Sequence, residues 1–299
     1  YATMRTFNKV ITLVLAVLFV AASFAACSSN SGKDDKGTTE AAKTQKVKVI
    51  DIALSDEEYA FGVDKKQPEL KEKANAFIKE LKKNGKLDEI CNHYFGSGEP
   101  AGVTSAAEDS TKDQLVVATN AEFEPFEYKK GDTFYGIDME IAKALADSLG
   151  KELVIKDMKF EAVVTSVQQQ KCDIAMAGLT VNETRAKQVD FTDSYYSASQ
   201  KVVVKGDDTT FDACKTKEDV EKILNGLDSS VKIGGQNGTT GQSYVQGSKD
   251  MGFAGLKAQF VGYDNASLAM QDLINGNLNY VIVDAAPAAA ITTAINNVA

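Results

Sequence analysis

Tryptophan is absent from this 299-residue chain, and histidine occurs once, at His93. A single imidazole excludes sites built from several histidines and most histidine-dependent catalysis, so we expect no metal and no cofactor. Basic residues are also scarce, because 33 lysines and arginines stand against 42 aspartates and glutamates, a formal charge of -9. Nucleic-acid binding needs a basic surface, and this balance therefore argues against a nucleic-acid partner.

Cysteine is too rare for a disulfide framework. Of the four cysteines, Cys27 belongs to an N-terminal signal described below, which leaves Cys91, Cys172 and Cys214. Three cysteines cannot all pair with one another. We expect small, buried or half-buried side chains here, with one bridge among them as the alternative.

The N-terminus predicts export. Arg5 and Lys9 precede an uninterrupted apolar or small stretch over residues 10–26, and the chain turns polar directly after Cys27. This pattern is typical of a secretory signal peptide, so residues 1–26 are expected to be removed. The small residues before Cys27 resemble a bacterial lipobox, which would make Cys27 the lipid-bearing residue. The alternative is an ordinary cysteine after an ordinary signal peptide.

Two stretches of small and polar residues divide the rest of the chain. Residues 28–45 contain no large apolar side chain and cannot bury enough surface to offset chain entropy. With Cys27 they form the flexible tether 27–45. Residues 97–113 have the same character apart from Val103 and predict an internal linker. The total length suits two domains.

Between these stretches the pattern predicts strands over residues 47–50 and 59–63, followed by two helices. The first helix begins near Pro68 and stops at Asn84, and the second is short. His93 lies on the second helix away from its apolar stripe, where we expect an exposed side chain.

From residue 115 onward, strands and helices alternate, which predicts a mostly parallel sheet with helices on both faces. Thr216 and Asp219 have the spacing of a helix capping box. The predicted strands cover residues 115–118, 153–156, 173–176, 201–204, 231–233, 259–261 and 280–283.

In open α/β sheets a ligand binds beyond the carboxyl ends of the strands. Thr180 and Arg185 follow one predicted strand at a helix start, where free amides and an arginine fork suit a carboxylate. A surface ion pair is the alternative for Arg185. Residues 238–241 (GTTG) predict a second anion cradle or a simple turn. Asp284 is either a helix cap or the counter-ion of a ligand cation.

Four motifs carry a resemblance to a known family: residues 117–128 (VATNAEFEPFEY), 136–138 (GID), 177–185 (AGLTVNETR) and 189–196 (VDFTDSYY). Together they resemble the polar-amino-acid solute-binding proteins of bacterial importers, and the resemblance extends over residues 47–299. It implies an α/β, two-lobed, type II periplasmic-binding-protein-like fold. Each lobe would be a mixed, mostly parallel sheet flanked by helices, and two crossovers would form the hinge.

The resemblance also implies roles for single residues. Arg185 would clamp the ligand α-carboxylate with Thr180, Thr239 and Thr240, and Asp284 would face the α-ammonium with the carbonyl of Gly178. The rest of the pocket would consist of the aromatic walls Phe123 and Phe160, together with Asn120, Ala177, Gln236 and Val283. Simple core packing remains the alternative for Phe160.

One departure from the family concerns the ligand. Related glutamine-binding and basic-amino-acid-binding proteins commonly carry an acidic residue where this chain has Asn120. A cationic side chain therefore loses an obvious counter-ion, and this favours a neutral polar ligand.

The other departure concerns the order of segments. Residues 54–63 and the two helices after them resemble the C-terminal end of the family, yet they precede residue 115. We interpret this order as a circular permutation, in which residues 97–113 join the ancestral termini. A fragment of two tandem proteins or a misassembled gene is the alternative. Permutation predicts one lobe over residues 60–194, a second from 46–54 plus 200–299, and a hinge near 55–59 and 195–199.

These features predict a monomeric lipoprotein on the extracytoplasmic face of the cytoplasmic membrane. It would capture a free polar amino acid between its lobes and deliver it to the permease of an ABC importer. One alternative is an enzyme on the same scaffold, similar to cyclohexadienyl or arogenate dehydratases, with Glu122 and Glu161 as the nearest acids. Another is the ligand-sensing subunit of a separate signalling partner.

Overall fold

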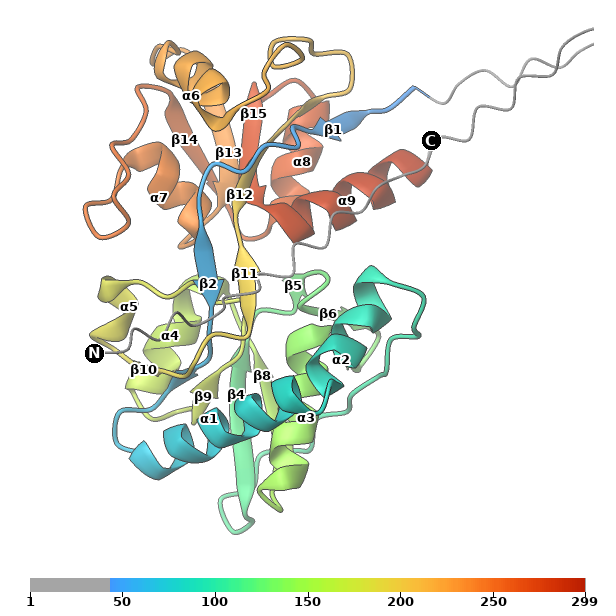
Figure 1. The fold of residues 1–299 in the computed structure, drawn as a ribbon, viewed down its shortest axis with the longest axis vertical. Coiled ribbons are helices and arrows are strands. Elements are labelled where there is room, and N and C mark those ends of the chain that lie inside the picture. The colour runs from blue at the N-terminus through green and yellow to red at the C-terminus, as the bar shows by residue number, and fades with distance from the viewer. Residues whose placement is uncertain (1–43, 299) are drawn as a thin grey trace, which may run out of the picture. The chain divides into compact units, whose positions relative to one another are not determined.

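The computed structural model describes residues 44–298, and what was predicted for residues 1–43, including the signal peptide and Cys27, lies outside them. The described residues form one compact unit. This unit contains two five-stranded sheets, which occupy the upper and lower halves of Figure 1. Within the described residues no helix has the length and apolar character needed to cross a bilayer.

The first sheet has the strand order β1-β12-β15-β13-β14. Its strands are β1 (Val47–Val49), β12 (Gln200–Lys205), β15 (Tyr280–Asp284), β13 (Lys232–Gln236) and β14 (Gln259–Tyr263). Because β12 pairs antiparallel with both β1 and β15, it alone runs against the other four.

Side chains of the first sheet alternate between its two faces, as the pleat requires. Val202 and Val204 pack with helices α6 (Lys217–Asn225) and α7 (Thr240–Gln246). Val203 packs on the other face with α8 (Ala266–Ile274) and α9 (Ala285–Asn297). The apolar run in β12 is therefore buried on both sides.

The second sheet has the order β10-β3-β9-β4-β8, and here β3 is the one reversed strand. Its strands are β10 (Asp190–Phe191), β3 (Gly62–Val63), β9 (Ile174–Ala175), β4 (Gln114–Thr119) and β8 (Glu152–Asp157). Helices α1 (Pro68–Lys83), α2 (Lys86–Phe95) and α3 (Ile137–Ser148) share one core cluster with this sheet. Helix α4 (Phe160–Gln168) packs on its other face.

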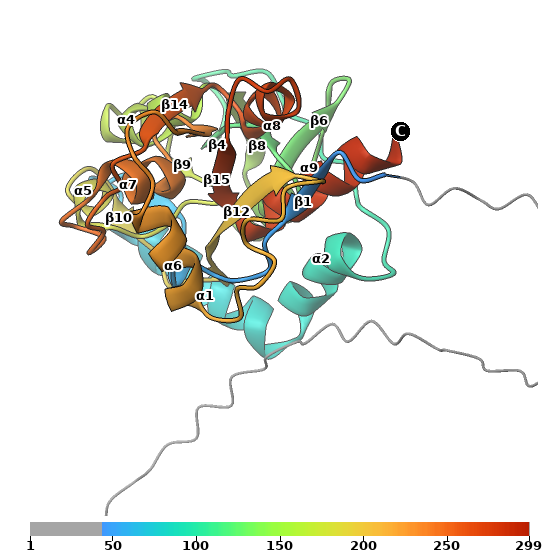
Figure 2. The same cartoon turned by 90° about the horizontal axis from the view of Figure 1, so that it is seen from above.

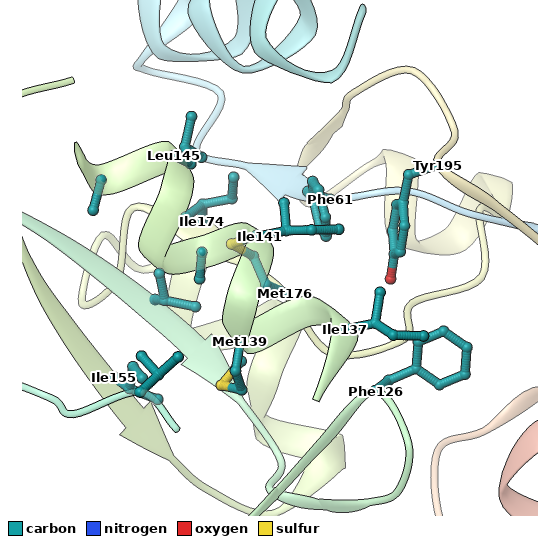
Figure 3. Packing of buried hydrophobic residues seen from close by; sticks show 14 of the residues in the cluster. Phe61, Phe126, Ile137, Met139, Ile141, Leu145, Ile155, Ile174, Met176 and Tyr195 are labelled. Carbon is teal, nitrogen blue, oxygen red and sulfur yellow. The ribbon is translucent and has the colours of Figure 1, made fainter. Parts of the chain in front are cut away.

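Figure 3 shows the core between α3 and the second sheet. Ile137, Ile141 and Leu145 recur every four residues along α3 and are buried with Ile174 of β9. This helical spacing places the apolar side chains on one face, and their burial is the main source of stability here.

Two further ladders complete the fold. Strand β2 (Glu57–Tyr59) pairs antiparallel with β11 (Tyr196–Ala198), and the two pass between the sheets in Figure 1. Strands β5 (Glu122–Phe123), β6 (Glu127–Lys130) and β7 (Thr133–Tyr135) form a small antiparallel sheet. Val103, in the segment between α2 and β4, exchanges two backbone hydrogen bonds with Phe134 of β7, at 2.7 and 2.8 Å.

The end of α9 lies beside the start of β1, as both views show (Figures 1 and 2). The Asn296 side chain accepts hydrogen bonds from the backbone N–H of Lys46 and Val47, at 2.9 and 3.3 Å, and donates one to the Val47 carbonyl at 2.8 Å. Segments about 250 positions apart in the chain are thus neighbours in space.

The structure confirms the first two helices, including the stop at Asn84, and the capping box of Thr216 with Asp219. Cys91, Cys172 and Cys214 are free. The single strand predicted over residues 59–63 is wrong, because the chain leaves the β2 ladder and then enters the second sheet as β3. The exposed position predicted for His93 is also wrong. Its ring is partly covered, and its Nδ1 lies 2.7 Å from the buried Glu140 carboxylate.

Candidate functional site

The predicted site residues follow the carboxyl ends of four parallel strands. Asn120 follows β4, and the loop from Ala177 to Thr180 follows β9 in the second sheet. Gln236 ends β13 and Asp284 ends β15 in the first sheet. The strand-end rule therefore places the candidate residues at one edge of each sheet.

Arg185 lies on the four-residue helix α5 (Glu183–Ala186), which Asn182 caps through a hydrogen bond from the Arg185 backbone N–H. Its side chain is 8% exposed, which excludes the alternative of a surface ion pair. The guanidinium donates to the carbonyl oxygens of Thr180 at 2.7 Å and Gly238 at 3.0 Å. It also lies 5.4 Å from the ring centroid of Phe160. Arg185 thus connects loops from both sheets.

Asp284 is 4% exposed and accepts a hydrogen bond from the hydroxyl of Tyr59, which is itself fully buried. It occupies the position before α9, but its side chain makes no capping hydrogen bond. Burial raises the pKa of this carboxyl to about 7, and the nearby charge of Glu57 adds to the effect. Tyr59, Gln200 and Arg185 act in the opposite direction.

Burial lowers the pKa of the Arg185 guanidinium, while Asp284 and Glu57 act to raise it. One cation and two carboxylates therefore share a desolvated region, where their charges interact more strongly than in water. Such perturbed groups are typical of functional sites.

Glu57 also belongs to this site, although the sequence analysis did not include it. It is 3% exposed and accepts hydrogen bonds from Ser55, from the Thr180 hydroxyl at 2.8 Å and from Gln200 at 3.2 and 3.3 Å. The Thr180 hydroxyl proton is thereby committed to Glu57. Thr180 contributes its carbonyl to Arg185, and its predicted role as a carboxylate donor would require this bond to break.

Asp138 holds the Gly178 loop in place through a hydrogen bond. Its carboxylate accepts the Gly178 backbone N–H at 2.7 Å and the Tyr195 hydroxyl at 2.5 Å. Burial raises the pKa of Asp138 to about 6, against the effect of these two hydrogen bonds. Gly178 has φ +51°, and a Cβ there would lie 2.7 Å from the Phe123 ring. The absence of a side chain therefore allows Phe123 to pack directly on this loop.

Asn120 and Gln236 connect the two sheets directly. The Gln236 amide donates to the Asn120 side-chain oxygen at 2.9 Å, and the Asn120 amide donates to the Met158 carbonyl at 2.8 Å. Thr239 donates to the Gln236 carbonyl at 2.7 Å and precedes α7, which begins at Thr240.

The predicted residues fall into three connected groups: Arg185 with Thr180, Gly238 and Phe160; Gly178 with Phe123; and Asn120 with Gln236 and Thr239. Asp284 is joined to Tyr59, which sequence reasoning missed along with Glu57 and Gln200. Ala177 and Val283 are buried next to Gly178 and Asp284 in the chain. Within residues 44–298 no group of three or more His, Cys, Asp or Glu side chains could hold a metal ion.

Two mixed sheets, a pair of connecting strands and polar strand ends define a type II periplasmic-binding-protein-like fold. Solved structures agree. An ancestral arginine-binding protein bound to glutamine is 35% identical, with a TM-score of 0.51 over 62% of this chain and 76% of that one. The ancestral amino acid-binding protein AncCDT-1, a precursor of cyclohexadienyl dehydratase, is 28% identical, with a TM-score of 0.52 over 70% and 78%. The predicted fold class is confirmed.

The chain belongs to the bacterial extracellular solute-binding proteins, family 3, which it matches over residues 115–279. It is 41% identical to the arginine-binding extracellular protein ArtP of Bacillus subtilis over 36% of this chain and 42% of that protein. It is 30% identical to the ABC transporter arginine-binding protein 1 of Escherichia coli over 59% and 65%. The chain thus spans less than two thirds of the length of these relatives.

Proposed function

We propose that this protein captures a free polar amino acid between its two sheets and delivers it to the permease of an ABC importer. The observation that carries the proposal is the pair Arg185 and Asp284. Both are buried and of opposite charge; Asp284 ends β15 of the first sheet, and Arg185 lies on α5 between β9 and β10 of the second. The hydrogen-bond partners found for them are neutral: two carbonyls for Arg185, and the Tyr59 phenol with the Gln200 amide for Asp284. An amino acid zwitterion supplies the complementary charges for both.

In this proposal the ligand α-carboxylate binds the Arg185 guanidinium in place of one or both of its carbonyl partners, because the planar guanidinium fork suits a carboxylate. The start of α7 at Thr239 and Thr240 lies next to Gly238 and supplies backbone N–H groups. The α-ammonium faces Asp284 and the Gly178 carbonyl. Phe123 and Phe160 then line the side chain of the ligand, and Asn120 and Gln236 offer it neutral polar groups.

The named ligands of relatives narrow the choice. Curated relatives are named for arginine or histidine, and ancestral arginine-binding proteins have been solved with arginine and with glutamine. The neutral Asn120 in our chain favours an uncharged polar side chain over a cationic one. Arginine and glutamine are therefore the first ligands to test.

We expect one or more polar amino acids to raise the melting temperature of the chain lacking residues 1–27. Ligand at about 100 times its dissociation constant stabilises the native state by about 2.7 kcal/mol. For a protein of this size that corresponds to a shift of roughly 5–10 °C. The measurement is a thermal-shift screen of the common amino acids and cystine, confirmed by calorimetry.

The α-carboxamide of the same amino acid serves as the matched control, because it keeps the side chain and loses the charge that Arg185 is proposed to bind. It should give no shift. A screen in which no amino acid shifts the melting temperature would contradict the proposed function.

The clamp that we propose has one lobe over residues 60–194 and a second from 46–54 plus 200–299. Strands β2 and β11 lie between the ends of these two lobes in the chain. Residues 55–59 and 195–199, which contain the two strands, would therefore form the hinge. Hinge bending in a few residues of two crossing strands is a common way to enclose a ligand.

We also propose that the segment order is a genuine permutation. The family match begins at residue 115, yet the earlier strand β1 pairs with β12 and β3 lies between β9 and β10. The contacts of Asn296 with Lys46 and Val47 support a former connection between α9 and β1. Permutation is tolerated where termini lie close together at the surface.

A single tryptic peptide tests this order. Cleavage after Lys86 and Lys112 should yield residues 87–112, which connect α2 to the segment before β4. Mass spectrometry of the native protein should detect it. If peptides from before residue 87 and from after residue 112 are detected, but the peptide that connects them has a different sequence, the result would favour the misassembled gene.

The remaining parts of the proposal concern location and activity. We propose that Cys27 carries a lipid that holds a monomer at the extracytoplasmic face of the membrane. We also propose binding without catalysis, because the acids considered for an enzyme, Glu122 and Glu161, are both exposed. A general acid or base is normally held in a desolvated position beside the reacting carbon.

A further inference from the structure

The carboxylate of Asp250, which lies with the first sheet, binds the helix that carries Arg185. Asp250 lies in the turn after α7, where Ser248 and Phe253 exchange backbone hydrogen bonds at 2.9 and 2.8 Å. Its two oxygens accept the backbone N–H groups of Glu183 and Thr184, each at 2.8 Å. These amides belong to the first turn of α5, where N–H groups have no partner within the helix.

The geometry ties α5 to the first sheet at two points. Arg185 reaches the Gly238 carbonyl before α7, and Asp250 reaches α5 from the turn after α7. Partial burial acts to raise the pKa of Asp250, but the hydrogen bonds from Thr184 and Glu183 keep that pKa below its ordinary value. The carboxylate is therefore charged near neutral pH, and charge-assisted hydrogen bonds of this kind are among the stronger ones.

Another contact between the first-sheet and second-sheet parts of the molecule is a solvent-exposed ion pair. Lys159, before α4, forms an ion pair of 3.2 Å with Asp264, after β14, but their side chains are 69% and 50% exposed. Exposed ion pairs contribute little, because both groups are well solvated when apart. Asp264 therefore provides a carboxylate of equal charge that also connects the two halves.

We propose that Asp250 is a latch: when a ligand is enclosed, it holds α5, and with it Arg185, against the first sheet. Its hydrogen bonds go to the backbone of α5, and its charge acts to raise the pKa of the nearby Arg185 guanidinium, so it is a positioning residue. The inference rests on the proposed function. It adds a residue that sets how long the closed form persists, and hence the rate of ligand release.

Asp250→Asn tests the latch, with Asp264→Asn as the matched control. Asparagine keeps the size but directs an N–H₂ group toward one of the two amides, so one hydrogen bond is lost and the other loses its charge. We expect ligand release, measured by stopped-flow fluorescence or surface plasmon resonance, to become about tenfold faster or more. The association rate should change less than about twofold, since most interface changes act on release. The Asp264 variant should match the wild type within about twofold in both rates.

Amide hydrogen exchange supplies a second readout. In the wild type, ligand should slow exchange at the Glu183 and Thr184 amides, and in the Asp250 variant this protection should be lost. Equal release rates in the two variants, or no ligand-dependent protection in the wild type, would overturn the latch. If the wild type binds no amino acid at all, the proposed function fails instead.

Discussion

Replacing Arg185 by alanine is expected to weaken the binding of every amino acid ligand by at least about 100-fold. Removal of one partner from a buried, hydrogen-bonded charge pair costs about 2–5 kcal/mol, because the ligand carboxylate is then desolvated without a counter-charge. The loss should not depend on the ligand side chain, since Arg185 is proposed to contact the group that all amino acids share. Calorimetry with two different ligands measures it.

Arg185 also has a structural task, and the experiment must separate the two. Its side chain donates to the carbonyls of Thr180 and Gly238, so alanine leaves these acceptors without a partner and should lower the melting temperature of the ligand-free protein. Arg185→Lys is the control, because it keeps the charge and loses the planar fork. We expect a folded protein with binding weakened by about tenfold or more. Near-normal affinity in the alanine variant would remove Arg185 from the site.

The fold was accessible to sequence reasoning because its signals are local. The spacing of Ile137, Ile141 and Leu145 predicts a helix, and the structure has that helix as α3, with all three side chains buried. Thr216 and Asp219 predict a helix start from a hydrogen-bond pattern confined to four residues. In such cases the determining interactions lie within a few positions of one another.

Part of the site was accessible for the same reason. Arg185 and Asp284 each follow an apolar strand, and the rule that ligands bind at the carboxyl ends of strands selects them. The rule does not say which groups surround them. Only the structure shows that Arg185 is buried and that the Tyr59 hydroxyl donates a hydrogen bond to Asp284.

The residues that were missed act across long sequence separations. Glu57 accepts from Thr180, 123 positions away, and from Gln200, 143 positions away. When these partners are not known, a glutamate next to a second glutamate in the sequence is expected to be exposed to solvent. One signal was present: Glu57 and Tyr59 share a face of β2, opposite the exposed Glu58, and an aromatic residue on the same face as an acid indicates burial.

His93 shows the same limitation. Its position off the apolar stripe of α2 predicts exposure, but Glu140 of α3 is buried beneath it and supplies a hydrogen-bond partner at 2.7 Å. The helical pattern describes which side chains meet the main core. It does not describe a polar contact between neighbouring helices.

Asp284→Asn is expected to remove ligand binding and at the same time to stabilise the ligand-free protein above neutral pH. The native pKa of Asp284 is about 7, raised from 3.8. Between these values the native state binds more protons than the unfolded state, so this group's contribution to stability falls as the pH rises and is lost above about 7. Asparagine cannot ionise and avoids that loss. The gain at pH 8 is at most about 4 kcal/mol, and at pH 4 it should vanish.

Asp272→Asn is the matched control, because Asp272 also accepts a hydrogen bond from a tyrosine, Tyr263, at 2.7 Å. Its pKa is lowered, chiefly by that hydrogen bond and another from Asn277, so the sign is opposite. This variant should be unchanged or slightly less stable at pH 8 and should bind ligand normally. Thermal melts at pH 4 and 8 compare the two variants.

Wild-type binding should carry the same proton linkage. A ligand ammonium favours ionised Asp284, so the proton held below about pH 7 must leave when the ligand binds, and the affinity should fall as the pH drops. The limiting slope is about tenfold per pH unit. Calorimetry at pH 6 in two buffers of different ionisation enthalpy should detect proton release approaching one per ligand. Affinity that stays constant from pH 5.5 to 8 would mean that Asp284 is ionised before the ligand arrives and that Tyr59, Gln200 and Arg185 compensate for its burial.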